Sequence, residues 1–245
     1  MDSLWIAATG ARSILRRQDV ITNNLANVNT VGYRGAQPQF RALPVYGEPL
    51  PSNAYVATQG SSSDFQQGPL MHTGRSLDVA VQGPGWIAVQ AADGSTAYTR
   101  NGDLRISGNG LLSTSDGHPV LSQNGTPISV PQMQSLQIGA DGTISGVPAG
   151  SPASAAVVLG RIQLVNPPAA QLQRGVDGLF RDTQGPAQPD PSVQLAIGAL
   201  EGSNVNPVHA MVQMLDNTRA FEMQTKLMQS LGQDQQAAAQ LLNVS

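Results

Sequence analysis

A seven-residue repeat of apolar side chains runs through the first 34 residues, and it constrains the fold more than any other feature of the chain. The repeated positions are alternately three and four residues apart, which is the a/d spacing that keeps one seam of an α-helix facing a partner. The seam consists of Leu4, Ala7, Ala11, Ile14, Gln18, Ile21, Leu25 and Val28. Because no neighbouring segment can bury this seam, we expect it to pack against a second helix.

The second helix is predicted at the other end of the chain, where Met214, Phe221, Met228, Gln235 and Leu242 lie seven residues apart. We expect the terminal helices to pair as a coiled-coil-like unit, and we expect their apolar positions to form an assembly interface. On the second helix the expected interface residues are Met211, Met214, Leu215, Phe221, Met228, Leu231, Ala238, Leu241 and Leu242.

Local signals set the expected ends of both helices. Asp2 or Ser3 can cap the first helix, which is predicted to run to about Asn27. The second is expected to start at Pro207, at the first helical position, with Asn206 as the N-cap, and to run to about Leu242.

Between the helices the pattern changes twice. Residues 36–73 are rich in proline and glycine, which favours an extended connector with one hairpin and edge strands near 40–45 and 54–57. Residues 74–201 show alternating short runs separated by Asx-Gly pairs, from Asp93-Gly94 to Asp177-Gly178. Such pairs are the strongest local hairpin signal, because both turn residues are expected to have positive φ. The expected buried strands are 77–81, 86–89 and 157–165.

These patterns predict an α+β fold with three parts. Residues 1–35 and 202–245 would form a terminal-helix domain, residues 36–73 a connector, and residues 74–201 an all-β domain of short antiparallel strands.

The composition excludes several function classes. Charged residues are only 12% of the chain and the net charge is -3, whereas binding to nucleic acid rests on clustered Lys and Arg. The absence of cysteine excludes disulfides, thiolate metal sites and a cysteine nucleophile. No apolar run is long enough to span a membrane, and we expect no cleaved secretory leader, because no basic segment precedes an apolar core.

The residues that could perform chemistry are scattered. His72, His118 and His209 have no metal-ligand spacing, so each is expected in a turn or on the surface. Asp78, Asp103 and Asp116 could be paired carboxylates in principle, but one surface acid on each strand is the ordinary arrangement. We therefore predict no catalytic, cofactor-binding or metal-binding residue, and we expect the chain not to be an enzyme.

The apolar stripes allow two interpretations. Both helices could be the core of one globular domain, which is the usual meaning of such a stripe. Their length, their positions at the two ends of the chain and a β region that can bury its own apolar residues favour helices that offer their outer faces to neighbouring subunits. Repeated contacts of this kind produce an open helical assembly when the rotation does not close.

Several stretches resemble the signatures of the bacterial flagellar basal-body rod and hook protein family. Residues 23–34 and 203–208 resemble its terminal motifs, 219–223 resemble a third, and 73–83 and 98–102 resemble its β domain. The motif residues are Asn24, Leu25, Ala26, Asn27, Asn29, Thr30, Gly32 and Tyr33, followed by Asn204, Asn206 and Pro207. The resemblance covers essentially the whole chain. His209 departs from it, because relatives usually carry an acidic residue there.

The resemblance implies a structural subunit of the rod, located in the flagellar basal body within the periplasmic space. Its implied partners are copies of itself, other proximal and distal rod proteins, and the flagellar type III export apparatus that would export it unfolded. The modest length and short connector resemble the proximal-rod members. The terminal helices would form the inner tube, and the chain would transmit motor torque between proximal and distal rod. The alternatives are a distal-rod or other axial member, or a secreted β-rich binding module on a helical stalk.

Overall fold

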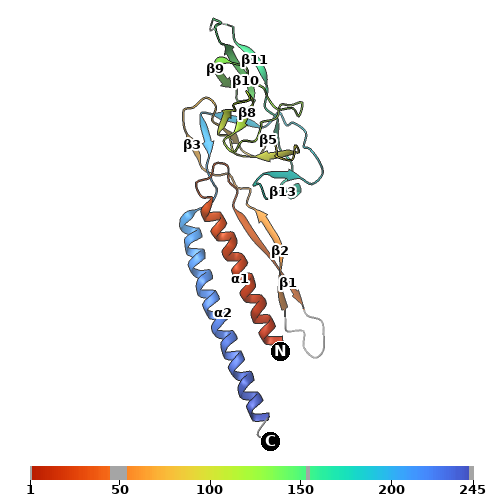
Figure 1. Ribbon diagram of the computed structural model, residues 1–245, viewed down its shortest axis with the longest axis vertical. Helices are drawn as coiled ribbons and strands as arrows, with labels where there is room; N and C mark the ends of the chain where they lie inside the picture. Colours follow the sequence, from red (N-terminus) through yellow and green to blue (C-terminus); the bar gives the residue numbers. More distant parts are fainter. Residues whose placement is uncertain (1, 45–53, 153–154, 243–245) are drawn as a thin grey trace. The chain divides into compact units, whose positions relative to one another are not determined.

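The computed structural model describes residues 2–44, 54–152 and 155–242, except for the side chains of 2–7, 40–44, 54–61 and 234–242 (Figure 1). The chain divides into two compact units. We call them the terminal-helix unit, which comprises Met1–Asn27, Gly35–Asp64 and Val205–Ser245, and the β domain, which comprises Val28–Arg34 and Phe65–Asn204.

The terminal-helix unit consists of two long helices and one β-hairpin. Helix α1 spans Asp2–Ala26 and α2 spans Pro207–Leu242, and they lie side by side and run in opposite directions (Figure 1). Strands β1 (Ala36–Pro44) and β2 (Ala54–Ser63) pair antiparallel and contact α1. The hairpin predicted in the connector is therefore confirmed, with strands longer than expected. The strand predicted near 40–45 extends to Val45, which lies outside the described residues.

Capping residues define two boundaries of this unit. Helix α2 begins at Pro207, and the side-chain oxygen of Asn206 accepts a hydrogen bond from the backbone N–H of His209 at 3.1 Å, which confirms Asn206 as its N-cap. Near the end of α1, Asn24 binds the backbone of Ala36 twice, at 2.8 Å through its Nδ2 and at 2.8 Å through its Oδ1. This amide fixes the start of β1 beside α1.

The β domain is built from short antiparallel strands. Its strands are β3 (Leu70–His72), β4 (Val79–Gln82), β5 (Trp86–Gln90), β6 (Thr96–Thr99), β7 (Leu104–Ile106), β8 (Leu112–Thr114), β9 (Met133–Ile138), β10 (Thr143–Pro148), β11 (Val157–Arg161), β12 (Leu164–Val165), β13 (Leu172–Arg174), β14 (Phe180–Asp182), β15 (Gln194–Ile197) and β16 (Ala199–Glu201), with a short 3-10 helix at Ala169–Gln171. They form a five-stranded sheet in the order β12-β5-β6-β14-β13, a three-stranded sheet β11-β10-β9, and the pairs β15-β4, β16-β3 and β7-β8.

Two apolar clusters form the core of the β domain. The larger one gathers aliphatic side chains such as Val79, Ile87 and Leu112, all fully buried. The smaller one is aromatic, with Trp86 and Phe180 at a ring-centroid distance of 4.7 Å. Burial of this kind stabilises the domain without a partner chain.

Six of the seven Asx-Gly pairs lie in turns, as the sequence predicts, whereas Asn101-Gly102 does not, and the expectation that both turn residues have positive φ is wrong. Within the described residues, glycines alone have positive φ. At Asp93-Gly94, for example, the N–H of Gly94 donates to the carbonyl of Ala91 at 2.9 Å, so Gly94 is the fourth residue of the turn. Such a turn followed by a left-handed glycine is the usual three-residue hairpin loop. At Asn101-Gly102 the reason for glycine differs, because a Cβ there would lie 1.6 Å from the carbonyl oxygen of Val79.

The long buried strand predicted over 157–165 is also wrong. It is two strands, because Val157–Arg161 pairs with β10 while Leu164–Val165 pairs with β5 in another sheet. Val157 and Val158 are 47% and 68% exposed, so the first part is not buried. An apolar run alone does not distinguish an edge strand from a central one.

The α+β class is confirmed, while the coiled-coil geometry of the helix pair stays a prediction. The two compact units also differ from the predicted division, because residues 28–34 belong to the β domain and 35–64 to the terminal-helix unit. No helix in the described part of the chain is long and apolar enough to cross a bilayer.

Candidate assembly surfaces and the junction of the terminal motifs

The predicted seam of α1 faces the interior of the terminal-helix unit wherever its side chains are described. Ala11 and Ile21 are buried, and Ile14, Gln18 and Leu25 are half-buried. The intervening Arg12, Arg16 and Arg17 are exposed. Val28 is half-buried in the β domain, and the side chains of Leu4 and Ala7 lie outside the described residues.

The inner face of α2 contains residues that the sequence analysis missed. Ala220, Thr225 and Gly232 are half-buried, and beside them a series of less exposed positions alternates by four and three residues, as a helix seam requires. The series is Ala210, Met214, Asn217, Phe221, Gln224, Met228 and Leu231. Ala210 is small and Asn217 and Gln224 are polar, so none of the three carries the large apolar side chain that marks a seam in the sequence, although the same four-three spacing includes them. Ala238, Leu241 and Leu242 lie outside the described side chains.

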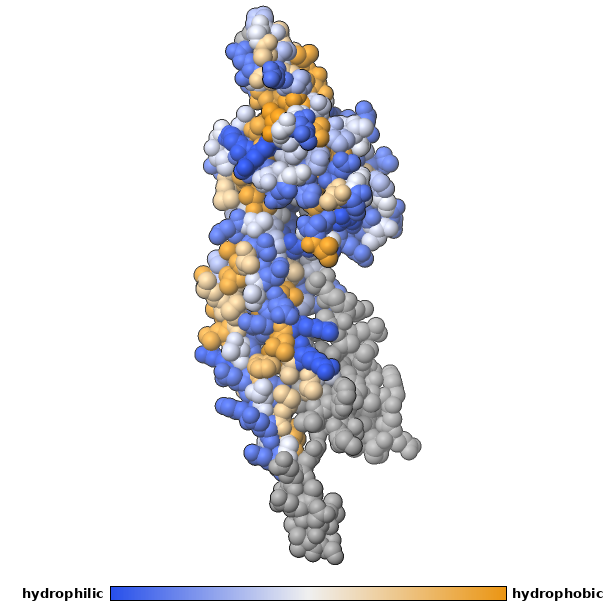
Figure 2. Space-filling model, viewed as in Figure 1, coloured by the Kyte–Doolittle hydropathy of each residue, from blue (hydrophilic) through white to orange (hydrophobic). Residues whose placement is uncertain are grey.

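A second apolar stripe lies on the outer face of α2. Val208, Met211, Val212 and Leu215 are 69%, 57%, 52% and 52% exposed. Their spacing of three and four residues puts them on one side of the helix. We call these four residues the outer stripe. Met211 and Leu215 were predicted to be interface residues, and both are exposed in the single chain. Figure 2 shows apolar side chains along the visible face of the helices.

Polar groups interrupt the contact between the helices. Nδ2 of Asn217 donates to the backbone carbonyl of Ile14 at 2.9 Å and to Oε1 of Gln18 at 2.8 Å. Farther along, the helices approach closely at Gly10, where a Cβ would lie 3.1 Å from Nε2 of Gln224. The pairing of α1 with α2 thus includes specific polar contacts as well as apolar ones.

Arg34 of the N-terminal motif meets Glu201, two residues before the C-terminal motif, inside the β domain. Nη1 of Arg34 lies 2.5 Å from Oε1 of Glu201, and Nη1 of Arg100 lies 3.0 Å from Oε2. All three side chains are buried. The backbone is joined too, because the N–H of Gly32 donates to the carbonyl of Glu201 at 2.7 Å. The carboxylate also accepts from the N–H of Gly68 at 2.9 Å.

This junction carries an excess of positive charge, with two guanidinium groups and one carboxylate. Burial lowers the pKa of Arg100 to about 10, the charge of Glu201 opposes that shift, and the charge of Arg34 adds to it. Nε and Nη2 of Arg34 have no hydrogen-bond partner among the described residues. Arg100 is better satisfied, because it also donates to the carbonyls of Val81 and Gly83 at 3.2 and 2.6 Å. Glu201 is therefore the group on which the neutralisation of both arginines depends.

Other motif residues contribute packing around the same point. The guanidinium of Arg174 lies 4.3 Å from the ring centroid of Tyr33 and donates to the carbonyl of Arg34 at 2.9 Å. Nδ2 of Asn204 donates to the carbonyl of Gln66 at 3.1 Å. Gly32 has a φ of +69° and contacts the backbone of Arg100 so closely that a Cβ would lie 2.3 Å from its carbonyl carbon. Gly32 and Tyr33 thus attach the N-terminal motif to the β domain.

Comparison with known proteins gives consistent matches along the chain. Residues 4–34 match the family described as flagella basal body rod protein, residues 80–146 the flagellar hook protein FlgE/F/G D1 domain, and residues 196–241 the flagellar basal body rod FlgEFG protein C-terminal region. The chain is 44% identical to the flagellar basal-body rod protein FlgF of Escherichia coli strain K12, with 100% of both chains covered. The chain belongs to the flagellar basal-body rod protein family.

Two further relatives support this assignment. The FlgF of Salmonella typhimurium strain LT2 is 43% identical over 100% of both chains, and the FlgG of Buchnera aphidicola subsp. Schizaphis graminum is 31% identical over 98% of this chain and 99% of that protein. The chain is a structural subunit of the rod of the flagellar basal body, and it is FlgF-like. A binding module on a helical stalk is not favoured.

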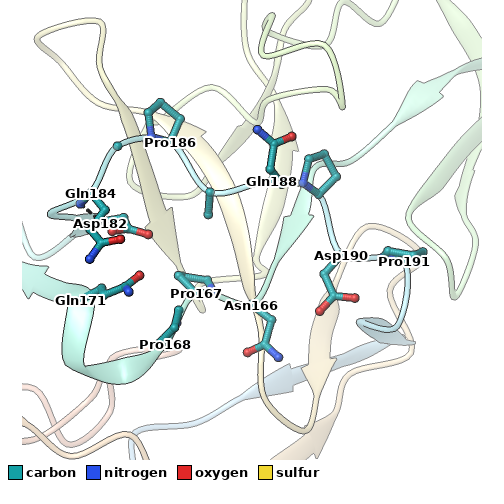
Figure 3. Close-up of a pocket in the computed structure, with 13 residues that line it drawn as sticks. Asn166, Pro167, Pro168, Gln171, Asp182, Gln184, Pro186, Gln188, Asp190 and Pro191 are labelled. Carbon is teal, nitrogen blue, oxygen red and sulfur yellow. Dashed lines mark hydrogen bonds between the residues drawn. The ribbon is translucent and has the colours of Figure 1, made fainter.

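The concavity in Figure 3, of about 490 Å³, does not resemble an enzyme site. Five prolines are among the residues that line it, and its two carboxylates support turns. Asp182 accepts from the N–H of Gln184 at 2.8 Å, and Asp190 accepts from the N–H and Oγ of Ser192 at 2.9 and 2.6 Å. In the described part of this rod protein, no three His, Cys, Asp or Glu side chains are grouped as metal ligands.

Two acids that the sequence analysis placed on separate strand surfaces lie together. Nη2 of Arg75 is 3.0 Å from Oδ1 of Asp78 and 2.9 Å from Oδ1 of Asp103. Asp78 is buried, so the expected surface position is wrong for it. Burial tends to raise the pKa of Asp103, but its hydrogen bond and ion pair with Arg105, together with Arg75, give a net lowering. An arginine between them makes this a structural ion cluster rather than a pair of catalytic carboxylates.

Proposed function

We propose that this rod protein assembles through its terminal helices, which pack against the helices of neighbouring rod subunits and form the inner tube of the rod. The observation that carries this proposal is the outer stripe of α2, whose four apolar side chains are each at least half exposed in the single chain. An apolar stripe of this kind is typical of a helix that is covered in its assembly. The seam residues of α1 and α2 would contribute by holding the two helices of each subunit together, so that the outer stripe faces neighbouring subunits.

The proposed mechanical role is to transmit motor torque between the proximal and distal rod. Interlocked apolar seams suit this role, because close-packed protein interiors have low compressibility and transmit strain. A position in the proximal rod is supported by the modest length and short connector of the chain, and by its full-length identity of 44% and 43% to the FlgF proteins of Escherichia coli and Salmonella typhimurium.

The proposed partners are copies of this chain, other proximal and distal rod proteins, and the flagellar type III export apparatus. Export in an unfolded state fits helices whose apolar faces are completed only by neighbouring subunits, since such segments order when they bind. The proposal gives the chain a structural role and no enzymatic one.

The proposal is tested by charged substitutions in two places. Ile14→Asp and Phe221→Asp put a charge into the seam, and Met211→Asp and Leu215→Asp put one onto the outer stripe. We expect all four variants to lose motility and rod assembly, because an unpaired carboxylate costs several kcal/mol when an interface buries it. Motility in soft agar and electron microscopy of isolated basal bodies measure the outcome.

Matched controls keep each position apolar. Ile14→Val, Phe221→Leu, Met211→Leu and Leu215→Met should swim and build complete rods. The β domain should unfold at the same denaturant concentration in every variant, because none of the four positions belongs to it. Charged variants that still build complete rods would show that these faces are not the assembly interface.

A further inference from the structure

We propose that Asn217 and Gln18 fix the axial register of α1 against α2. The contact between these helices is apolar at most of its buried positions, such as Ala11, Ile21 and Ala210. Asn217 is the exception, since it is only 4% exposed and carries an amide. Both acceptors of its Nδ2 group belong to α1, the carbonyl of Ile14 and Oε1 of Gln18.

An apolar seam alone does not fix how far one helix slides along the other. A slide of seven residues returns apolar side chains to equivalent positions, because the spacing repeats with that period. Gln18 is itself on the seam, and its neighbours one repeat away are Ala11 and Leu25. A slid helix would therefore bring Asn217 opposite a side chain that has no acceptor. The backbone carbonyl that accepts from Nδ2 recurs at every repeat, but the side-chain acceptor of Gln18 does not. Losing that acceptor for a buried amide disfavours the slid register by roughly tenfold or more.

The same amide carries a cost in the observed register. Oδ1 of Asn217 is buried and has no hydrogen-bond partner among the described residues. An apolar side chain at this position would avoid that cost. A single buried amide in an apolar helix seam is known to specify alignment at the expense of stability, and this is the role that the contacts of Asn217 fit.

The close approach at Gly10 reports the same alignment independently. Gly10 lies opposite Gln224, while Gln18 lies opposite Asn217. The two contacts are eight residues apart on α1 and seven on α2 in the opposite direction, which agrees with one antiparallel register.

The register determines where the outer stripe lies relative to α1. A slide of one repeat would move Val208–Leu215 along α1 by about 10 Å, at 1.5 Å per residue. A neighbouring subunit that recognises both helices would then meet a mismatched surface. This last step rests on the proposed function, whereas the register itself does not.

Disulfide trapping in the full-length chain tests the register. The chain contains no cysteine, so only introduced pairs can form a disulfide. The pair Gly10→Cys with Gln224→Cys reports the observed register, and Gly10→Cys with Leu231→Cys reports a slide of one repeat. Each pair is introduced into the natural background, into a background with Gln18→Leu and Asn217→Leu, and into a control background with Gln229→Leu on the exposed side of α2.

We expect the first pair to form at least about tenfold more disulfide than the second in the natural and control backgrounds. In the background with Gln18→Leu and Asn217→Leu, the two pairs should form disulfide within about twofold of each other, while circular dichroism shows undiminished helix content. A preference that survives these two substitutions, a natural chain with no preference, or a loss of helix content in the leucine background would each overturn the proposal.

Motility separates this inference from the proposed function. Cells that carry the chain with Gln18→Leu and Asn217→Leu should swim poorly, although the seam of this variant remains apolar. If this variant loses the register but its cells swim normally, the register proposal stands, while the proposed recognition of both helices by a neighbouring subunit fails. If its register is kept, the register proposal fails whatever the motility.

Discussion

The two units of this rod protein differ in what their apolar residues contact. In the β domain, large side chains such as Ile87, Leu112 and Tyr98 are completely or almost completely buried within the same chain. Among the side chains of α2 that are described, six large apolar ones are about half exposed or more, Met223 and Leu227 among them. Burial of apolar surface is the main driving force of folding. The β domain achieves this burial within its own chain, whereas the proposed assembly would bury the exposed apolar side chains of α2.

Polar residues show the same contrast. In the β domain a buried ion cluster at Glu201 joins segments that are remote in the sequence. In the terminal-helix unit the buried polar contact is a neutral amide pair between Asn217 and Gln18. Removing one partner of a charged cluster strongly destabilises the fold, because it leaves a buried charge unpaired. Breaking an amide pair costs less free energy, and such a pair can specify the alignment of two helices.

The largest effect expected in the β domain is from Glu201→Gln. It leaves Arg34 and Arg100 buried without a counter-charge, which should lower the free energy of unfolding by about 3–5 kcal/mol. Urea unfolding followed by the fluorescence of Trp86, in a Trp5→Phe background, measures the loss. It should be confined to the β domain, which would sharpen the contrast between the units.

The matched control for Glu201→Gln is Arg34→Met. It leaves one arginine paired with one carboxylate, so it should cost at least about 1 kcal/mol less than the change at Glu201. If the two variants are equally unstable, the excess positive charge does not determine the stability of the junction.

The next largest loss of stability is expected from Gly32→Ala, which tests whether the N-terminal motif is part of the β domain. The added Cβ would lie 2.3 Å from the carbonyl carbon of Arg100, and φ at Gly32 is +69°. We expect a loss of about 2–4 kcal/mol in the same urea experiment, from steric overlap and backbone strain together.

Gly74→Ala is the control for backbone strain alone. Gly74 has a similar φ of +74°, but no atom lies within 4 Å of its Cβ position. Its loss should be only about 1 kcal/mol. Equal losses at Gly32 and Gly74 would mean that the contact with Arg100 does not matter.

The smallest effect expected is an acid-induced loss of stability in the β domain. Hydrogen bonds from Ser95, Thr143 and Ser192 lower the pKa values of Asp93, Asp141 and Asp190, respectively, below the ordinary value of 3.8. A lowered carboxylate pKa stabilises the folded state above 3.8, and that contribution disappears as the pH falls through the folded-state pKa.

The urea midpoint of the β domain should therefore be level above about pH 5 and should fall below about pH 4. Thr143→Ala and Ser192→Ala each remove a hydroxyl group that donates to an aspartate. With both substitutions, the urea midpoint should fall less steeply as the pH is lowered. If the variant with both substitutions keeps the acid dependence of the natural chain, these turns do not contribute to the loss of stability in acid.

Local patterns predicted much of the fold. Apolar repeats predicted both helices, with Asn206 and Pro207 marking the start of α2, and six of the seven Asx-Gly pairs marked turns of the β domain. The same patterns failed where the answer depended on a partner strand. Val157 and Val165 lie in one apolar run of the sequence, yet they pair in different sheets.

The candidate site was predicted only in part. Met214, Phe221 and Met228 were identified as seam residues from their spacing, and their position on the inner face of α2 is consistent with that prediction. Asn217 was missed because an amide carries no apolar signal. The sequence marked Gly32 and Tyr33 as motif residues, but nothing near them indicates that the neighbouring Arg34 pairs with Glu201.

The sequence by itself determined the helices and the turns, and through its motifs the family, because each depends on residues that are close together along the chain. The tertiary structure alone decided which apolar faces stay exposed, that Arg34 and Arg100 share one carboxylate, and that Asn217 meets Gln18. These contacts join residues far apart in the sequence. Their energies exist only when folding has removed water and placed the partners within hydrogen-bond distance.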